Sequence, residues 1–185
     1  MRVIAGKAKG HPLKSVPGNI TRPITDRAKS ALFSILSTGV IHSQFLDLFA
    51  GTGQVGIEAL SRGAAQAVLV EQSPVAVRTI RDNLTRTKLE AGARVVRADV
   101  FDFLARQPEP FDFVYVAPPQ YHGLWAKTLQ MLDTHIGWLA PDAWVIAQIH
   151  PREYSEPTTE HLALFDRRTY GGVMLCFYEQ VGRDA

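Results

Sequence analysis

The sequence predicts a doubly wound α/β fold whose mainly parallel sheet ends in one antiparallel strand. Apolar runs rich in Val, Ile, Leu and Phe alternate with helical patterns from residue 44 onward, as expected for strands that are buried on both faces. A glycine-rich turn joins the first of these strands to its helix. The last two strand-like runs flank Gly171 and Gly172, which leaves too few residues for a crossover helix and predicts an antiparallel hairpin.

The elements can be assigned in order along the chain. Thr25 precedes "DRAKSALFSIL", where apolar residues recur at helical spacing, and this combination predicts a capped amphipathic helix. Short buried strands and helices then alternate. The predicted strands are 44–50, 65–71, 93–98, 111–117 and 143–150, and the predicted helices are 54–63, 74–89, 99–107 and 123–136. Residues 162–181 form the terminal hairpin.

The composition indicates a single globular domain without a membrane segment or a metal centre. The chain has 185 residues, of which 46% are hydrophobic and 21% charged, as in ordinary folded domains. Cys176 is the only cysteine, which excludes an internal disulfide and favours a reducing compartment. The histidines lack metal-ligand spacing, and neither a signal peptide nor a membrane span is visible. We therefore expect a cytoplasmic monomer.

Positive charge is concentrated at the N-terminus. The first 30 residues carry a net charge of +6 within a chain of net charge +2, so the remainder is acidic. Residues 1–20 are predicted to form a basic β-hairpin, with strands "RVIAG" and "HPLKSV", that extends the main domain of residues 21–185. Such a segment suits a polyanion, although the same charge could merely keep the hairpin soluble. The expected contacts are Arg2, Lys7, Lys9 and Lys14.

Three glycines follow the first sheet strand directly. Gly51, Gly53 and Gly56 have the spacing G-x-G-x-x-G between a strand and a helix. Glycine allows a ligand to approach the backbone, and the helix N-terminus offers unpaired N–H groups. This pattern favours a nucleotide-type cofactor over an ordinary tight turn, without identifying the cofactor.

Three acidic residues occupy positions that suit such a cofactor. Asp47 lies within the first strand, where a carboxylate needs a cationic partner or the N–H groups of the loop; bracing the turn is the alternative. Glu71 ends the second strand and fits an acceptor for ribose hydroxyls, or it is a solvated strand end. Asp99 follows the third strand, where it could contact an adenine amino group or cap the next helix.

The fourth strand ends in "APPQY", Ala117 to Tyr121. In an open α/β sheet this edge faces the ligand crevice. Consecutive prolines leave rigid carbonyl acceptors, which suit a substrate that donates, such as an exocyclic amine. Tyr121 could stack on a flipped base. The alternative is a loop that only terminates the strand.

These motifs together resemble the class I S-adenosylmethionine-dependent methyltransferases, and more narrowly the RsmD-type enzymes that methylate a guanine N2 in bacterial 16S ribosomal RNA. The resemblance covers nearly the whole chain, through "RVIAGKAKGHPLKS", "TRPITDRAKSALFSIL", "FLDLFAGTGQVGIEALSRGA", "LVEQ" and the proline pair. It implies a Rossmann-like seven-stranded sheet with a reversed last strand. It also implies S-adenosylmethionine as cofactor, and ribosomal RNA or the small ribosomal subunit as partner.

The resemblance also implies roles for individual residues. Asp47, Gly51 and Gly53 would hold the methionine end of the cofactor, Glu71 the ribose and Asp99 the adenine. The cofactor-binding residues are thus expected to be Asp47, Phe49, Gly51, Gly53, Glu71 and Asp99. The segment that leads into the first helix is expected near the substrate, through Arg22, Thr25 and Arg27.

One motif departs from the family pattern of Asp or Asn, Pro, Pro, and Tyr or Phe. This chain has Ala117, Pro118, Pro119 and Gln120, with Tyr121 displaced by one position. Ala117 removes a side-chain acceptor for the target amine, so we expect the Pro118 carbonyl and Gln120 to act as acceptors and Tyr121 to act as the stacking ring. A noncatalytic RNA-binding or cofactor-binding relative is the alternative function. A nicotinamide-dependent oxidoreductase is a third candidate, which Asp47 and the proline pair disfavour.

Overall fold

The computed structural model describes residues 1–18 and 24–181 of the chain. Its principal helices are α1 (Asp26–Leu36), α2 (Gln54–Ser61), α3 (Pro74–Thr87), α4 (Val100–Leu104) and α5 (Leu124–Thr134). The strands are β1 (Gln44–Asp47), β2 (Gln66–Glu71), β3 (Ala93–Arg97), β4 (Phe111–Val116), β5 (Leu139–Ile149), β6 (Leu162–Tyr170) and β7 (Val173–Gln180). Four short 3₁₀ helices also occur in the described residues: η1 (Ser37–Val40), η2 (Glu90–Gly92), η3 (Ile136–Trp138) and η4 (Pro151–Glu153).

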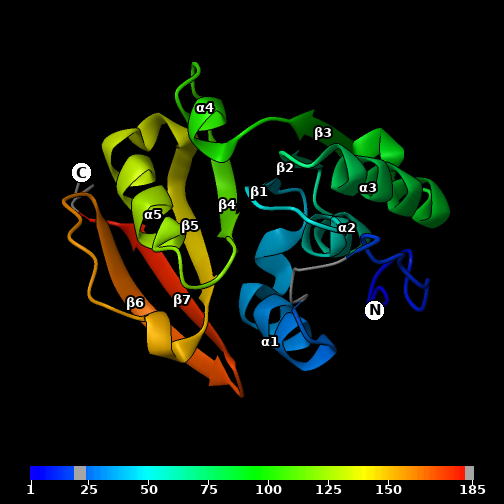
Figure 1. Cartoon of the computed structure of the whole chain (residues 1–185), viewed down its shortest axis with the longest axis horizontal. Coiled ribbons are helices and arrows are strands. Elements are labelled where there is room, and N and C mark those ends of the chain that lie inside the picture. The colour runs from blue at the N-terminus through cyan, green and yellow to red at the C-terminus, as the bar shows by residue number, and fades with distance from the viewer. Residues whose placement is uncertain (19–23, 182–185) are drawn as a thin grey trace.

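The strands form one seven-stranded sheet in the order β3-β2-β1-β4-β5-β7-β6. Strands β1 to β5 pair in parallel, whereas β7 runs antiparallel to both β5 and β6. Figure 1 shows β3 on one side of the molecule and the long β6–β7 hairpin on the other. The structure therefore confirms the doubly wound α/β fold and the reversed last strand.

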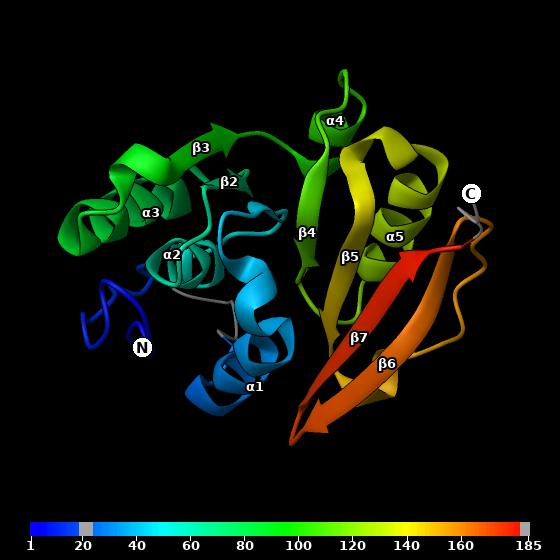
Figure 2. The same cartoon turned by 180° about the vertical axis from the view of Figure 1, so that it is seen from behind.

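Helices cover both faces of the sheet and create two apolar clusters. One cluster contains Leu32 of α1, Ile57 of α2 and Ile80 of α3. The other contains Phe103 of α4 and Leu129 of α5. Figure 2 shows α5 beside β4 and β5, and α2 close to α3 on the opposite side of the molecule. Strands β1, β2 and β4 are thus buried on both faces, which explains their near-continuous apolar sequences, whereas the edge strand β3 keeps exposed arginines.

The first strand is shorter than its apolar run. β1 ends at Asp47 rather than at residue 50, because the chain then turns into the glycine loop. The backbone of this turn remains tied to the neighbouring strands, since Leu48 N–H donates to the Tyr115 carbonyl and Ala50 N–H donates to the Val70 carbonyl, each at 3.0 Å. The loop is therefore held rigidly between β2 and β4.

The N-terminal arm, residues 1–18, does not form the two strands predicted for the hairpin. Within it the structure has a single antiparallel bridge, between Arg2 and Pro12. Backbone hydrogen bonds across the arm flank this bridge, such as the one from Val3 N–H to the His11 carbonyl at 3.0 Å, but the pairing stops after Val3. The N–H groups of Ile4 and Ala5 donate to the Glu58 carboxylate at 2.8 and 3.0 Å. The arm thus pairs with itself only over a short stretch and is also docked on α2.

A buried ion cluster fastens the arm, α1 and α2 together. The side chains of Lys29 and Glu58 are fully buried, and Lys29 Nζ lies 3.3 Å from the Glu58 carboxylate. Lys29 Nζ also donates to the Arg2 carbonyl at 2.6 Å, and Arg62 Nε lies 2.8 Å from Glu58. Burial lowers the pKa of Lys29, which the negative charge of Glu58 opposes. Lys29 belongs to the basic N-terminal segment in sequence, but it is inaccessible to a polyanion.

Replacing Glu58 by Gln should destabilise the fold strongly. The change removes the charge that compensates Lys29 and Arg62, and breaking a buried pair from one side typically costs about 3–5 kcal/mol. Urea unfolding followed by circular dichroism measures the loss. Asp82→Asn is the matched control, because its pair with Lys14 is largely exposed and its unfolding midpoint should equal that of the parent. Equal midpoints for Glu58→Gln and Asp82→Asn would contradict this role for the cluster.

Candidate active site

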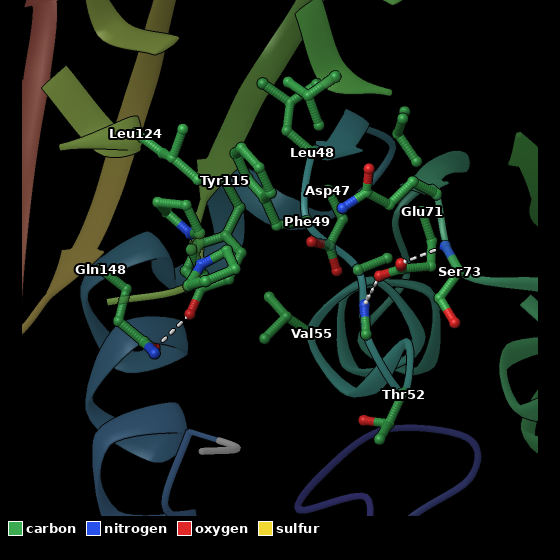
Figure 3. A pocket seen from close by; sticks show the side chains of 18 of the residues that line it. Asp47, Leu48, Phe49, Thr52, Val55, Glu71, Ser73, Tyr115, Leu124 and Gln148 are labelled. Atoms are coloured by element: carbon green, nitrogen blue, oxygen red, sulfur yellow. Dashed lines mark hydrogen bonds between the residues drawn. The ribbon is translucent and has the colours of Figure 1, made fainter. Parts of the chain in front are cut away.

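A cavity of about 630 Å³ opens where the parallel strands β1, β2 and β4 end. Its walls come from these strand ends, from the glycine loop and from the segments that follow β3 and β4 (Figure 3). Most of the predicted site residues meet here. The cavity is lined by Asp47, Phe49, Gly51, Glu71, Asp99, Ala117, Pro118, Pro119, Gln120 and Tyr121.

Asp47 contributes a buried carboxylate that is only half satisfied. Its side chain is 1% exposed. One oxygen accepts from Gly56 N–H at 3.2 Å, but the other has no hydrogen-bond partner among the described residues. Burial raises the pKa of Asp47 to about 7, reinforced by the charge of Glu71 and opposed by the nearby backbone N–H groups of Gly56 and Phe49. An orphaned buried oxygen is costly, and this one therefore suits a cationic or donating ligand.

Glu71 accepts hydrogen bonds from the backbone of two loops at the cavity. One carboxylate oxygen accepts from Gly51 N–H at 2.9 Å, and the other accepts from Ser73 N–H at 2.8 Å (Figure 3). Each oxygen has a second acceptor site. Glu71 can therefore hold the loops and still accept hydrogen bonds from hydroxyl groups in the cavity.

Asp99 caps α4 and also borders the cavity. Its carboxylate accepts from Phe101 N–H at 2.8 Å and from Asp102 N–H at 3.4 Å. The capping alternative for this residue is therefore confirmed. Because Asp99 lines the same cavity as Asp47 and Glu71, capping does not preclude a ligand contact.

The glycines of the loop have different tasks. Gly51 has φ +56°, and a Cβ placed there would meet nothing within 4 Å, so its backbone faces open space in the cavity wall. Gly53 precedes α2 with φ +77°, and a Cβ there would lie 3.2 Å from Leu69. Gly53 does not line the cavity, and its contribution is the left-handed turn. Gly56 packs closely on Leu69.

The segment after β4 places an exposed aromatic ring at the cavity rim. Tyr121 is 64% exposed and has φ +66°, a left-handed conformation that is unusual for a bulky residue. Its N–H donates to the Glu153 carboxylate of η4, and its ring lies 5.7 Å from the His150 ring. Glu153 also accepts from His150 N–H at 3.2 Å, so a single carboxylate pins the loop to the end of β5.

Tyr115 and Gln148 are polar residues of the cavity wall that the sequence predictions do not include. The hydroxyl of Tyr115 in β4 donates to the side-chain carbonyl of Gln148 in β5, and both residues line the cavity (Figure 3). Burial raises the pKa of Tyr115 well above its usual value, so the hydroxyl remains a neutral donor. The available signal was a lone glutamine within the apolar run "AWVIAQIH".

The predicted RNA-binding residues lie outside the cavity. Arg2, Lys7, Lys9 and Lys14 are exposed on the N-terminal arm, where Arg2 pairs with Asp26 at 3.4 Å and Lys14 pairs with Asp82 at 2.8 Å. No ion pair of Lys7 or Lys9 occurs within residues 1–18 and 24–181. These exposed charges remain available to a polyanion.

The structure describes Ile24 and Thr25 of the segment that leads into α1. Thr25 caps α1 by accepting from Ala28 N–H at 3.2 Å, as predicted, and Arg27 is exposed on the same helix. Ile24 lines the cavity, which places the start of α1 beside the site. Arg22 lies outside the described residues.

Asn83 connects the arm to the glycine loop. This fully buried amide donates to the carbonyls of Lys14 and Thr52 at 3.1 and 3.0 Å, and its oxygen accepts from Lys14 N–H at 2.7 Å. The basic arm is therefore fixed next to the cavity.

Across the described parts of the chain, no helix is long and apolar enough to cross a membrane.

Comparison with known proteins identifies the family. The family model described as conserved hypothetical protein 95 matches residues 1–179. YlbH of Bacillus subtilis is 36% identical over 186 residues, which cover 98% of this chain and 100% of YlbH. The Escherichia coli protein named ribosomal RNA small subunit methyltransferase D is 34% identical over 182 residues, which cover 97% of this chain and 90% of that protein.

A solved structure supports the same relationship. The Escherichia coli protein yhhF superposes with a TM-score of 0.86 at 34% identity, and the match covers 97% of both chains. The resemblance predicted from the sequence is thus confirmed along nearly the whole chain. The chain belongs to the family of conserved hypothetical protein 95, together with relatives named ribosomal RNA small subunit methyltransferase D.

Proposed function

We propose that this protein is an S-adenosylmethionine-dependent methyltransferase that modifies the exocyclic N2 of a guanine in small-subunit ribosomal RNA. The observation that carries the proposal is one continuous cavity with two chemically different ends. Acidic groups at the ends of β1 and β2 suit the cofactor, and acceptors at the ends of β4 and β5 suit a target amine. The names of the relatives support methyl transfer to ribosomal RNA and do not favour a noncatalytic RNA-binding role.

The residues at the first end fit the cofactor. S-adenosylmethionine, when bound, supplies an electrophilic methyl group. The unpartnered oxygen of Asp47 suits its positively charged methionine end, and Gly51 presents an uncovered backbone. Glu71 retains acceptor capacity for the ribose, and Asp99 for the adenine. Phe49 also lines this end of the cavity and would contact the cofactor there.

The residues at the second end fit a flipped base. The Pro118 carbonyl can accept one hydrogen of the target amine and so direct its nitrogen lone pair, with Pro119 holding the turn rigid. Gln120 offers a side-chain oxygen at the rim, and Tyr121 offers a flat face on which the base can stack. Proximity and orientation of this kind can contribute about 7–11 kcal/mol to catalysis.

The exposed basic residues give the RNA a docking surface beside the cavity. Lys7 and Lys9 on the arm, together with Arg2, Lys14 and Arg27, add positive charge to an otherwise acidic domain. Phosphate neutralisation supplies most of the sequence-independent affinity for RNA. Arg22 and Thr25 belong to the same segment. We place the protein in the cytoplasm as a monomer that acts on ribosomal RNA or on the small ribosomal subunit.

Methyl transfer to undermodified small-subunit RNA tests this function, and Tyr121 provides the diagnostic variants. The parent should convert one guanine to its N2-methyl form, identified by mass spectrometry of nuclease digests. Tyr121→Leu should lower kcat/KM about tenfold, because stacking of a base on an aromatic ring is worth about 1–3 kcal/mol. Tyr121→Phe keeps the ring and should match the parent. Absence of methylated guanine with the parent protein would refute the proposed function.

Cofactor affinity should depend on pH through Asp47. With a pKa of about 7, about a tenth of the Asp47 carboxyl groups are ionised at pH 6 and about half at pH 7. A cationic ligand prefers the ionised form, so the affinity for S-adenosylmethionine should rise about fivefold between these pH values. Calorimetric titration measures this rise. Asp47→Asn should bind more weakly and lose the dependence, whereas an unchanged pH slope in this variant would exclude Asp47 as the titrating group.

The arm lysines should control the salt dependence of RNA binding. Replacing Lys7 and Lys9 together by Gln removes two phosphate-binding charges, and the slope of log affinity against log salt concentration should fall by about 1.5. Fluorescence anisotropy with a labelled fragment of small-subunit RNA measures the slope. Arg106→Gln is the control, because Arg106 lies just after α4 on the opposite face of the sheet. Equal slopes for the arm variant and the parent would place the RNA elsewhere.

A further inference from the structure

The sheet register places a carboxamide beside Ala117. The last paired residues of β4 and β5 are Val116 and Ala147. One step further along these parallel strands, Ala117 and Gln148 stand next to each other. Ala117, which follows β4 and has no acceptor side chain, is therefore adjacent to the carboxamide of Gln148 in β5.

The Gln148 side chain lies on the same face as Ala117. Tyr115, two residues before Ala117, pairs with Ile146, two residues before Gln148, and side chains two residues apart in a strand share a face. The Tyr115–Gln148 hydrogen bond confirms that this face carries both side chains. Both residues line the cavity (Figure 3), and so does Ala117.

Tyr115 holds the carboxamide in a defined orientation. Its hydroxyl is buried and donates to Gln148 Oε1, which leaves this oxygen one further acceptor site. The high pKa of Tyr115 keeps the hydroxyl protonated, so the donor persists at neutral pH. A fixed acceptor in a buried cavity is what orientation of an amine requires.

Gln120 is less suited to the same task. It lies half-buried on the loop after the two prolines, and its side chain makes no hydrogen bond to another residue in the described parts of the chain. Its amide is not held in place, whereas that of Gln148 is. The remaining acidic side chains of the cavity, Asp47, Glu71 and Asp99, lie at the cofactor end.

We propose that Gln148 is the side-chain acceptor for the target amine, a catalytic residue that Tyr115 positions, and that it serves where Ala117 cannot. This inference rests on the proposed function. The Pro118 carbonyl would accept one hydrogen of the amine, and Gln148 Oε1 would accept the other. The nitrogen lone pair is then directed away from both acceptors.

Replacing Gln148 by Ala should lower kcat about 100- to 1,000-fold, as loss of one preorganised electrostatic partner does, while KM for RNA rises by no more than about fivefold. Gln130→Ala is the matched control and should retain the parent kcat, because Gln130 is exposed on α5 and does not line the cavity. Adding Ala117→Asn to Gln148→Ala should restore at least tenfold of the loss, because it returns a carboxamide to the adjacent strand. A structural role for Gln148 would give no such rescue.

A binding measurement gives a readout independent of turnover. Inosine lacks the N2 amine of guanine, and a site that hydrogen-bonds an amine discriminates against its absence. The parent should bind an RNA fragment with guanine at the target position about fivefold more tightly than the same fragment with inosine. Gln148→Ala should bind the two fragments equally. Retained discrimination in this variant would overturn the proposal.

A Tyr115→Phe background distinguishes loss of the acceptor in Gln148→Ala from destabilisation of the fold by an unpaired hydroxyl. Gln148→Ala leaves the buried Tyr115 hydroxyl without its partner, so the substitution is also made in a Tyr115→Phe background, where no hydroxyl remains. Tyr115→Phe alone should lower kcat about tenfold, and the double variant should be no slower than Gln148→Ala, because two residues that act as a unit are not additive.

The outcomes distinguish this proposal from the function on which it rests. A parent protein that methylates no guanine refutes the proposed function. A parent that methylates its target guanine, with Gln148→Ala equally fast in either background, overturns the role of Gln148 alone. Loss of kcat that Ala117→Asn does not relieve also counts against it.

Discussion

The buried carboxylate of Glu58 joins the N-terminal arm, α1 and α2. It accepts from two backbone N–H groups of the N-terminal arm and lies within 3.3 Å of Lys29 in α1. A fully buried carboxylate must have such partners. Glu58 belongs to α2, whose N-terminus is the glycine loop of the cavity. The same group therefore fixes the arm, the helix that starts beside the cavity and the helix that carries its glycine loop.

The two buried carboxylates Glu58 and Asp47 differ in how fully their oxygens are hydrogen-bonded, and this difference indicates a structural role for Glu58 and a ligand-binding role for Asp47. Glu58 has hydrogen-bond and ion-pair partners for both oxygens, whereas Asp47 has one oxygen with no partner within the described residues. Its raised pKa expresses the penalty for burying that charge. A fold retains such a penalty most readily where a ligand relieves it. Asp47 therefore marks the cofactor end of the cavity on physical grounds, independently of the glycine spacing.

Sequence periodicity predicted what depends on local pattern and missed what depends on tertiary contact. The alternation of strands and helices and the terminal hairpin follow from buried apolar runs and short connections, and the Thr25 cap follows from a local hydrogen bond. The N-terminal hairpin is shorter than predicted because Glu58, 53 residues from Ala5, accepts from the N–H groups of Ile4 and Ala5. Lys29 belongs to the basic N-terminal segment in sequence, and its burial depends on the tertiary contact with Glu58, which no local pattern shows. The cavity residues at strand ends were predictable, because parallel strands end at one edge of a sheet.

Gln148 shows why the location of a site is easier to predict from the sequence than the full set of residues that form it. Its relation to Ala117 is invisible along the chain, because α5 separates them and only the β4–β5 register brings them together. In a parallel sheet, neighbouring strands deliver side chains to the same point in the cavity at a fixed spacing of about 4.8 Å. A chemical group can therefore move from one strand to the next while its place in the cavity is nearly kept. What constrains the chemistry is the position of an acceptor relative to the amine, and two strands of this fold can supply it.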